Sequence, residues 1–238
     1  KETADMLHEV TSAYEANEFH KAVQIIGRFC GGVLSSIYHD VLKDRLYTLA
    51  PDDPCRRSSQ QAIEIIFRVL VRVVGPITPF TADEAWAHHL SGEDFTEDAL
   101  CLQPWPSADS DWYNEEVVSE VQSIFDFKVD VLNEKLEELR TRKEIGQSLD
   151  AEVEVKGSPT DEVFAVLSQR ETELAELFIV SSVVLVEDPS ASLSAEVRHA
   201  PGVRCPRSWR WVPELTDAGS WGEVSPRCAK VLAARTFM

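Results

Sequence analysis

Four residues near the C-terminus have the spacing of a zinc site, but only two of them are cysteines. The stretch CPRSWRW begins at Cys205 and the stretch SPRC ends at Cys228. With cysteine in place of Ser208 and Ser225, the spacing would be that of a four-thiolate zinc ribbon. A serine hydroxyl is a harder and far less acidic donor than a thiol, and His199 supplies at most a third ligand. We therefore interpret Cys205 and Cys228 as the remnant of a metal site and expect no zinc.

Without a metal, the C-terminal segment needs another source of stability. A four-thiolate site contributes on the order of 10–16 kcal/mol to the folding of a small zinc module. Packing is the expected substitute, and a disulfide between Cys205 and Cys228 is a second way to join the two halves of the segment. The apolar residues that offer such a core are Val203, Trp209, Trp211, Val212, Leu215, Trp221 and Val224.

No set of residues has the pattern of a catalytic site. Gly27, Gly31 and Gly32 lie in a helical pattern and do not match the spacing of a phosphate-binding loop. The adjacent histidines His88 and His89 diverge by about 100° on a helix, so they do not share a metal easily. The sequence therefore favours a binding module over an enzyme.

Charge is distributed unevenly along the chain. The 238 residues carry a net charge of −18, but residues 198–238 contain seven basic and three acidic residues, a local charge of +4 that leaves −22 for the remainder. An acidic body repels phosphates, whereas a basic segment attracts them. We expect a nucleic acid to contact the C-terminal segment; a basic tail without a partner is the alternative.

Composition favours the cytoplasm. Five cysteines at irregular spacing do not suggest a disulfide framework, and this favours a reducing compartment. Arg68 and Arg72 interrupt the longest apolar run, so no membrane span is expected. The chain begins without methionine, in helical sequence and without a signal peptide, and we interpret it as part of a longer protein.

The predicted fold class is mostly α, beginning with a helical bundle over residues 1–146. Apolar residues recur there at three- and four-residue steps, and capping residues mark several boundaries. The expected helices are residues 17–51, capped by Asn17; residues 58–74; residues 81–91, opened by a capping box at Thr81 and Glu84 and closed at Ser91-Gly92; and residues 112–145, ended by Gly146.

The pattern changes near residue 147. Alternating apolar and charged residues predict a strand at 149–156, and Ser158-Pro159 opens a helix expected over Asp161–Glu171. A β-branched run at Phe178–Glu187 predicts a second strand. Residues 147–197 are therefore expected to form a small α+β module. Residues 198–238 have little periodicity and are expected to form a loop-rich, zinc-ribbon-like knob.

Five stretches match a known family in the order in which that family has them: SSIYHDVLKDRLYT (35–48), RRSSQQA (56–62), PITPFTADEAW (76–86), LEELRTRKEIGQSLDAEV (136–153) and HAPGVRCPRSW (199–209). Together they resemble the anticodon-binding helical domain of class I aminoacyl-tRNA synthetases, and in detail the C-terminal part of the bacterial isoleucyl-tRNA synthetases. The valine, leucine and methionine enzymes share the bundle, so the isoleucine assignment depends on IGQSLDAEV and on the knob.

The resemblance implies a cytoplasmic, monomeric enzyme that joins isoleucine to its tRNA with ATP and magnesium. The family's HIGH and KMSKS motifs and its editing domain match nothing in this chain. We therefore expect the chain to bind tRNA for isoleucine without charging it, and we assign no catalytic residue. The alternatives are a protein-interaction module derived from a synthetase tail, with the acidic body as its contact surface, or the same region of a valine- or leucine-type enzyme.

The resemblance also implies which residues meet RNA. In the resembling enzymes four cysteines bind zinc, and an arginine and a tryptophan beside the second ligand reach the anticodon; these two correspond to Arg207 and Trp209. An indole stacks on an unpaired base, and a guanidinium binds a base edge or a phosphate. The alternative is a buried Trp209 that fills the space of the zinc.

Further phosphate contacts are expected from cations on the otherwise acidic bundle, because lysine and arginine position a nucleic-acid backbone without selecting a sequence. For the first two of them, ion pairs with Asp40 and Asp44 are an equally expected alternative. These candidate residues are Lys43, Arg45, Arg56 and Arg57.

Overall fold

The computed structural model describes residues 1–90 and 99–234. They form two compact units: unit 1 is Lys1–Asp40 with Asp52–Asn114, and unit 2 is Val41–Pro51 with the described residues from Glu115 onward. Among these residues no helix is both long and apolar enough to cross a bilayer. The domain boundaries that we predicted after residues 146 and 197 stay predictions.

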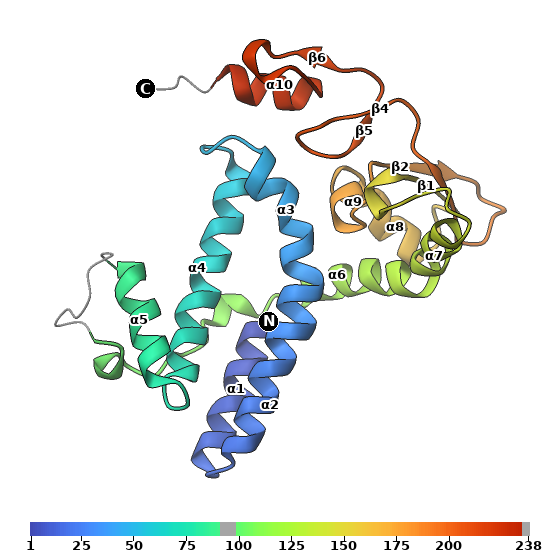
Figure 1. Ribbon diagram of the computed structural model, residues 1–238. Coiled ribbons are helices and arrows are strands. Elements are labelled where there is room, and N and C mark those ends of the chain that lie inside the picture. The colour runs from blue at the N-terminus through green and yellow to red at the C-terminus, as the bar shows by residue number, and fades with distance from the viewer. Residues whose placement is uncertain (91–98, 235–238) are drawn as a thin grey trace. The chain divides into compact units, whose positions relative to one another are not determined.

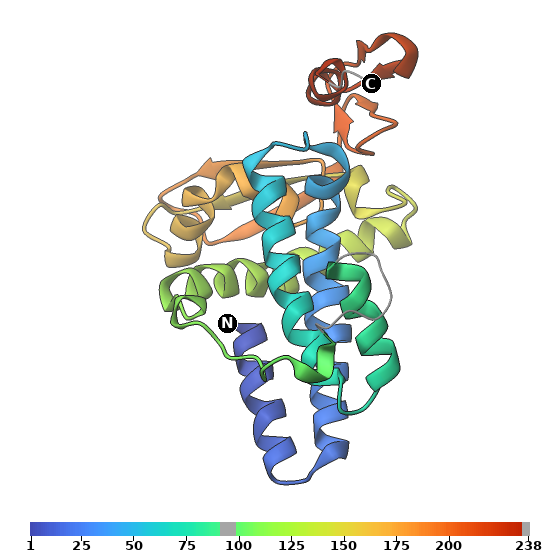
Figure 2. The ribbon, with the colours of Figure 1, turned by 90° about the vertical axis from the view of Figure 1, so that its left-hand side faces the viewer.

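Unit 1 is built from helices that share an apolar interior. Helices α1 (Glu2–Glu15) and α2 (Phe19–Arg28) form an antiparallel hairpin, and the chain continues through a π-helical segment, Phe29–Tyr38 (Figures 1 and 2). Helices α4 (Pro54–Val74) and α5 (Pro79–Leu90) complete the unit. The residues buried between α1, α2, the π-helical segment and α4 are Met6, Leu7, Val10, Ala13, Ala22, Ile26, Phe29, Leu34, Val69 and Val73.

The bundle is helical as predicted, but several of its predicted boundaries are wrong. Asn17 does not cap α2; it adopts a left-handed conformation, with φ of 58°, in the turn before the helix. Helix α4 begins earlier than predicted, because Asp53 caps it and Pro54 occupies its first turn. Helix α5 begins at Pro79, so Thr81 lies inside the helix and opens no capping box. Its predicted end at Ser91-Gly92 lies outside the described residues.

Unit 2 contains α3 (His39–Thr48) from Val41 onward, and two further helices follow it in this unit. Helices α6 (Glu115–Phe127) and α7 (Asn133–Thr141) are joined by a π-helical segment, Lys128–Leu132. The predicted cap at Gly146 is wrong: the left-handed residue after α7 is Lys143, with φ of 59°.

A three-stranded sheet follows, with strand order β2-β1-β3. Strand β1 (Ala151–Gly157) pairs in parallel with β2 (Ser182–Glu187), and α8 (Glu162–Gln169) and α9 (Glu171–Leu177) form the crossover between them. Strand β3 (Ser194–His199), which we did not predict, pairs antiparallel with β1. The cap of α8 is Asp161 instead of the predicted Ser158, because the Asp161 carboxylate accepts the Phe164 N–H at 2.9 Å.

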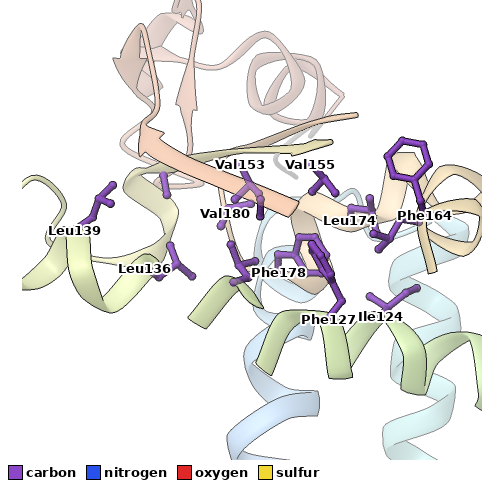
Figure 3. Packing of buried hydrophobic residues seen from close by; sticks show 14 of the residues in the cluster. Ile124, Phe127, Leu136, Leu139, Val153, Val155, Phe164, Leu174, Phe178 and Val180 are labelled. Atoms are coloured by element: carbon purple, nitrogen blue, oxygen red, sulfur yellow. The ribbon is translucent and has the colours of Figure 1, made fainter. Parts of the chain in front are cut away.

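One face of this sheet carries the main core of unit 2. Alternate residues of β1 are fully buried, as the period of two predicts. Figure 3 shows Val153 and Val155 pointing toward side chains from α6 and α7, among them Phe127 and Leu136. The other buried members are Ile124, Leu132, Leu139, Ile145, Ala151, Phe164, Leu167, Leu174, Phe178, Val180 and Ala195.

The knob contains two short hairpins and one helix. Strands β4 (Val203–Arg204) and β5 (Trp211–Val212) pair, as do β6 (Thr216–Asp217) and β7 (Glu223–Val224). Helix α10 (Pro226–Ala233), which we did not predict, begins at Ser225 as its cap. The predicted core of tryptophans is wrong; the buried residues are Cys205, Val224, Cys228 and Leu232. The two cysteines therefore lie inside the knob's small core.

We expect Gly157→Ala to destabilise unit 2. A Cβ at Gly157 would lie 2.5 Å from Cδ2 of Phe164, a ring that is fully buried against the sheet. Overpacking of this kind costs about 1–3 kcal/mol. Urea denaturation measures the change in the free energy of unfolding.

Gly27→Ala is the matched control. A Cβ at Gly27, in α2, has no other atom within 4 Å, and alanine is the better helix former by about 1 kcal/mol. Equal destabilisation by the two substitutions would contradict the packing described at Gly157.

Candidate nucleic-acid interface

Trp209 lies at an exposed turn of the knob. Its N–H donates to the carbonyl oxygen of Cys205 at 2.9 Å, and its backbone adopts a left-handed conformation with φ of 63°. The side chain is 55% exposed, and the guanidinium carbon of Arg204 lies 5.5 Å from the ring centroid. The alternative in which Trp209 fills the knob's interior is therefore wrong, and its indole is available for stacking.

Arg207, the other residue expected at the anticodon, is engaged within the protein. Its guanidinium donates to the carbonyl oxygens of Thr48 at 2.7 Å and Tyr47 at 3.0 Å. The last carbonyls of a helix lack partners in the helix and carry partial negative charge, so a guanidinium binds them well. Arg207 thus connects the turn that presents Trp209 to the end of α3.

A half-buried carboxylate on α3 makes the second connection, which we call the Asp44 clamp (Asp44, Arg210 and Arg227). The two guanidinium nitrogens of Arg227 donate to the Asp44 carboxylate at 2.7 and 2.8 Å, and Arg210 forms an ion pair with it at 3.6 Å. Burial raises the pKa of Asp44, but the hydrogen bonds from Arg227 and the charges of Arg210 and Arg227 outweigh this effect and lower the pKa.

The first hairpin of the knob also binds the α+β module. Trp211 donates its backbone N–H to the Ser181 hydroxyl at 2.7 Å and its indole N–H to Asp150 at 3.0 Å. Arg210 donates to the Val180 carbonyl at 3.1 Å. These bonds and the Asp44 clamp hold the chain after Trp209, and the bonds of Arg207 hold the chain before it.

The remaining predicted RNA contacts lie in both units. Arg45 forms an ion pair with Glu176, so it is paired within the protein. Lys43 is an exposed residue of α3. In unit 1, Arg56 and Arg57 lie in the first turn of α4, the former half-buried and the latter exposed. Contact of any of these residues with RNA stays a prediction.

The sequence did not reveal Arg204, Arg210 or Arg227 as functional residues, nor Asp44 as their anchor. No local signal identifies them, because Asp44 and Arg227 are 183 residues apart. The excess of positive charge in the knob was the one signal in the sequence that pointed to these arginines. It did not distinguish arginines that bind the protein itself from those that face solvent.

The donor set of the former metal site does not fit structural zinc. The sulfurs of Cys205 and Cys228 are 3.9 Å apart, near the tetrahedral edge of about 3.8 Å that a Zn–S bond of 2.3 Å implies. The other two positions hold hydroxyls, and Ser225 Oγ already accepts the Cys228 N–H at 3.3 Å. Within residues 1–90 and 99–234, no three histidine, cysteine or acidic side chains gather as ligands.

Hydrogen bonds take the place of a metal around Cys205. Its sulfur is fully buried and accepts the Ser225 N–H at 3.2 Å. Burial raises the pKa of the Cys205 thiol, but hydrogen bonds from Ser208 and Ser225 lower it to about 6. The serines that replace the ligands therefore stabilise a negatively charged sulfur.

Comparison with known proteins gives consistent matches. The family model for the anticodon-binding domain of tRNA ligase matches residues 1–155. Isoleucine–tRNA ligases from Thermotoga petrophila and Fervidobacterium nodosum are 35% and 34% identical over 96% and 95% of this chain, and that of Syntrophotalea carbinolica is 33% identical over 97%. The chain spans about a quarter of the length of these curated relatives, 25% in each case.

We expect Asp44→Asn to loosen the knob. The substitution removes the charge and one of the two oxygens that Arg227 binds, and it leaves the half-buried Arg210 without its counter-ion. Hydrogen bonds to charged groups contribute about 1.5–3 kcal/mol, and we expect a loss of that size in urea denaturation, with faster hydrogen exchange in residues 203–232.

The pH dependence provides a second readout. Because the folded-state pKa of Asp44 lies below its ordinary value of 3.8, the clamp's stabilisation is fully present above about pH 4 and is lost as the pH falls through the folded-state pKa. The difference between wild type and Asp44→Asn must then shrink below about pH 4. Glu9→Gln, in an exposed pair with Arg28, is the control, expected to change stability by less than about 0.5 kcal/mol.

We expect the purified chain to contain much less than one equivalent of zinc. Two thiols and two hydrogen-bonded hydroxyls bind zinc poorly compared with four thiolates, and a chelator should leave the melting temperature unchanged. Elemental analysis measures the metal. One equivalent of zinc that disappears in Cys205→Ser would show that the donor set had been misjudged.

Proposed function

The chain belongs to the isoleucine–tRNA ligases, of which it represents the anticodon-binding region, and from this premise we propose that it recognises tRNA for isoleucine through the knob and the helical bundle. Bases of the anticodon stack on Trp209, and cations of the bundle contact the phosphates of the stem. The rest of the enzyme activates isoleucine with ATP and magnesium and joins it to the tRNA. We place this enzyme in the cytoplasm and expect it to be a monomer.

The observation that carries this proposal is the exposed indole of Trp209 on a turn that is fixed at both ends. A base stacked on an aromatic side chain contributes about 1–3 kcal/mol to binding, and stacking requires a ring that is accessible before the RNA arrives. The half-exposed ring beside Arg204 meets that requirement. Asp44, Thr48 and Tyr47 hold the knob in place before RNA binds. Binding therefore does not have to supply the entropy cost of ordering the turn that carries the ring.

The contacts of Arg207 suggest another role than the expected contact with the anticodon, which stays a prediction. Because its donors bind carbonyl oxygens of α3, contact with a base edge would require breaking those bonds. We propose that Arg207 positions Trp209, and that the indole meets the RNA directly. The protein-interaction module stays an alternative prediction, as does a valine- or leucine-type enzyme.

We expect Trp209→Ala to weaken binding of tRNA for isoleucine by about 1–3 kcal/mol without changing the melting temperature of the chain, because the ring is exposed and lies outside the knob's core. Filter binding or fluorescence anisotropy with the 238-residue chain measures the affinity. Trp221→Ala, at another exposed indole of the knob, is the matched control.

The same assay tests specificity. Transcripts with altered anticodon nucleotides should bind more weakly to wild type and equally to Trp209→Ala. If wild type binds every transcript alike, anticodon recognition by this chain is refuted. If it binds no tRNA at all, the protein-interaction module becomes the better proposal, and preference for a valine or leucine tRNA would favour those enzymes.

A further inference from the structure

A basic pocket adjoins the Trp209 turn. It has a volume of about 510 Å³ and lies between the turn after α7 and the β3–β4 connection of unit 2. Arg204, which lies over the Trp209 ring, also forms part of its wall. The polar and aromatic residues that line it are Arg140, Lys143, Glu144, Asp150, His199, Arg204 and Trp211.

Two of the pocket's cations, Lys143 and Arg204, form no ion pair within the described residues. The side chains of Lys143 and Arg204 are exposed, and neither makes an ion pair with any residue in the ranges that the structure describes. Arg140 differs, because it pairs with Glu137 and donates to the Ser148 hydroxyl. An exposed cation with no acidic partner is available for an anionic ligand.

The acids of the pocket are Glu144 and Asp150, and they differ in how far their oxygens are occupied by hydrogen bonds. Both oxygens of Asp150 already accept hydrogen bonds, from the Trp211 indole and from the backbone N–H groups of Gly146 and Gln147, at 3.0 Å each. Burial raises the pKa of Asp150, but these hydrogen bonds outweigh that effect and lower the pKa, so its carboxylate keeps its charge but has both oxygens occupied. The lining has three positive charges, on Arg140, Lys143 and Arg204, and two negative charges, on Glu144 and Asp150. The pocket is therefore slightly positive on a chain whose net charge is −18.

His199 forms a fixed part of the pocket wall. Nδ1 of His199 lies 2.8 Å from the Ala200 carbonyl oxygen, which can only accept, so Nδ1 carries a proton. The ring is held edge-on against Trp211, with centroids 4.5 Å apart.

We propose that this pocket binds a phosphodiester of single-stranded RNA, and that Arg204 joins that phosphate to the base stacked on Trp209. A guanidinium can stack by its plane on an aromatic ring and donate at its edge to a phosphate at the same time. Lys143 approaches the phosphate from the turn after α7. This inference rests on the proposed function and assigns to Arg204 the contact that Arg207, already bound to α3, does not make.

The test is binding of tRNA for isoleucine to the 238-residue chain as a function of salt. We expect Arg204→Ala and Lys143→Ala each to lower the affinity about tenfold. Each should also reduce the slope of log affinity against log salt by about 0.7, the value for one phosphate contact on a single strand. Arg204→Lys should keep the slope and lose affinity, because it keeps the charge without the planar stack.

Arg198→Ala is the matched control, since Arg198 is a nearby exposed arginine paired with Glu152 and Glu154. The inference is overturned if Trp209→Ala weakens binding but Arg204→Ala and Lys143→Ala behave like Arg198→Ala. If Trp209→Ala has no effect, the proposed function itself fails and takes this inference with it.

A competition arm separates an RNA site from a site for free phosphate. Inorganic phosphate that displaces the tRNA no better than chloride at equal ionic strength supports a site for the RNA backbone. Displacement that is stronger with phosphate, and that Arg204→Ala abolishes, would assign the pocket to free phosphate and overturn the inference.

Discussion

The Asp44 carboxylate is the point on which the C-terminal part of the protein depends. Burial disfavours an isolated carboxylate or an isolated guanidinium because each loses its hydration. When their geometry allows hydrogen bonds, the attraction between the two groups offsets that cost. Arg227 provides that geometry with two short bonds, and Arg210 adds a second positive charge. Because both arginines belong to the knob and Asp44 belongs to α3, folding of the knob and its attachment to α3 are coupled.

This attachment explains how a small, loop-rich segment can remain ordered with a degenerate metal site. A core of two thiols, a valine and a leucine is small for an independent domain, and modules of this size usually need a metal or disulfides. Here the additional stabilisation comes from neighbouring structure: the α3 carbonyls that bind Arg207, and the Ser181 and Asp150 groups that bind Trp211. The sulfur atoms have become part of the packing.

The arginines of the knob divide into two groups with different roles. Arg210 and Arg227 pair with Asp44 on α3, Arg198 pairs with acids of β1, and Arg207 binds carbonyl oxygens of α3, so four arginines of this segment are bound within the protein itself. Arg204 is left exposed beside Trp209. An acidic protein can therefore present a small cationic surface to RNA without a large basic patch, which keeps contact with other phosphates weak.

The sequence by itself determined the features that act over a few residues. Helical periodicity predicted the bundle, alternation predicted β1, and the ordered family stretches identified the region. The predicted helix starts were wrong where a residue other than the expected one caps the helix, as Asp53 does for α4 and Asp161 does for α8. Only the tertiary structure decided that Arg207 is an anchor and Arg204 is exposed. Both arginines belong to the β4–β5 hairpin, but only Arg207 lies beside the end of α3, which is about 160 positions earlier in the chain. Local sequence propensity does not encode such a long-range partner.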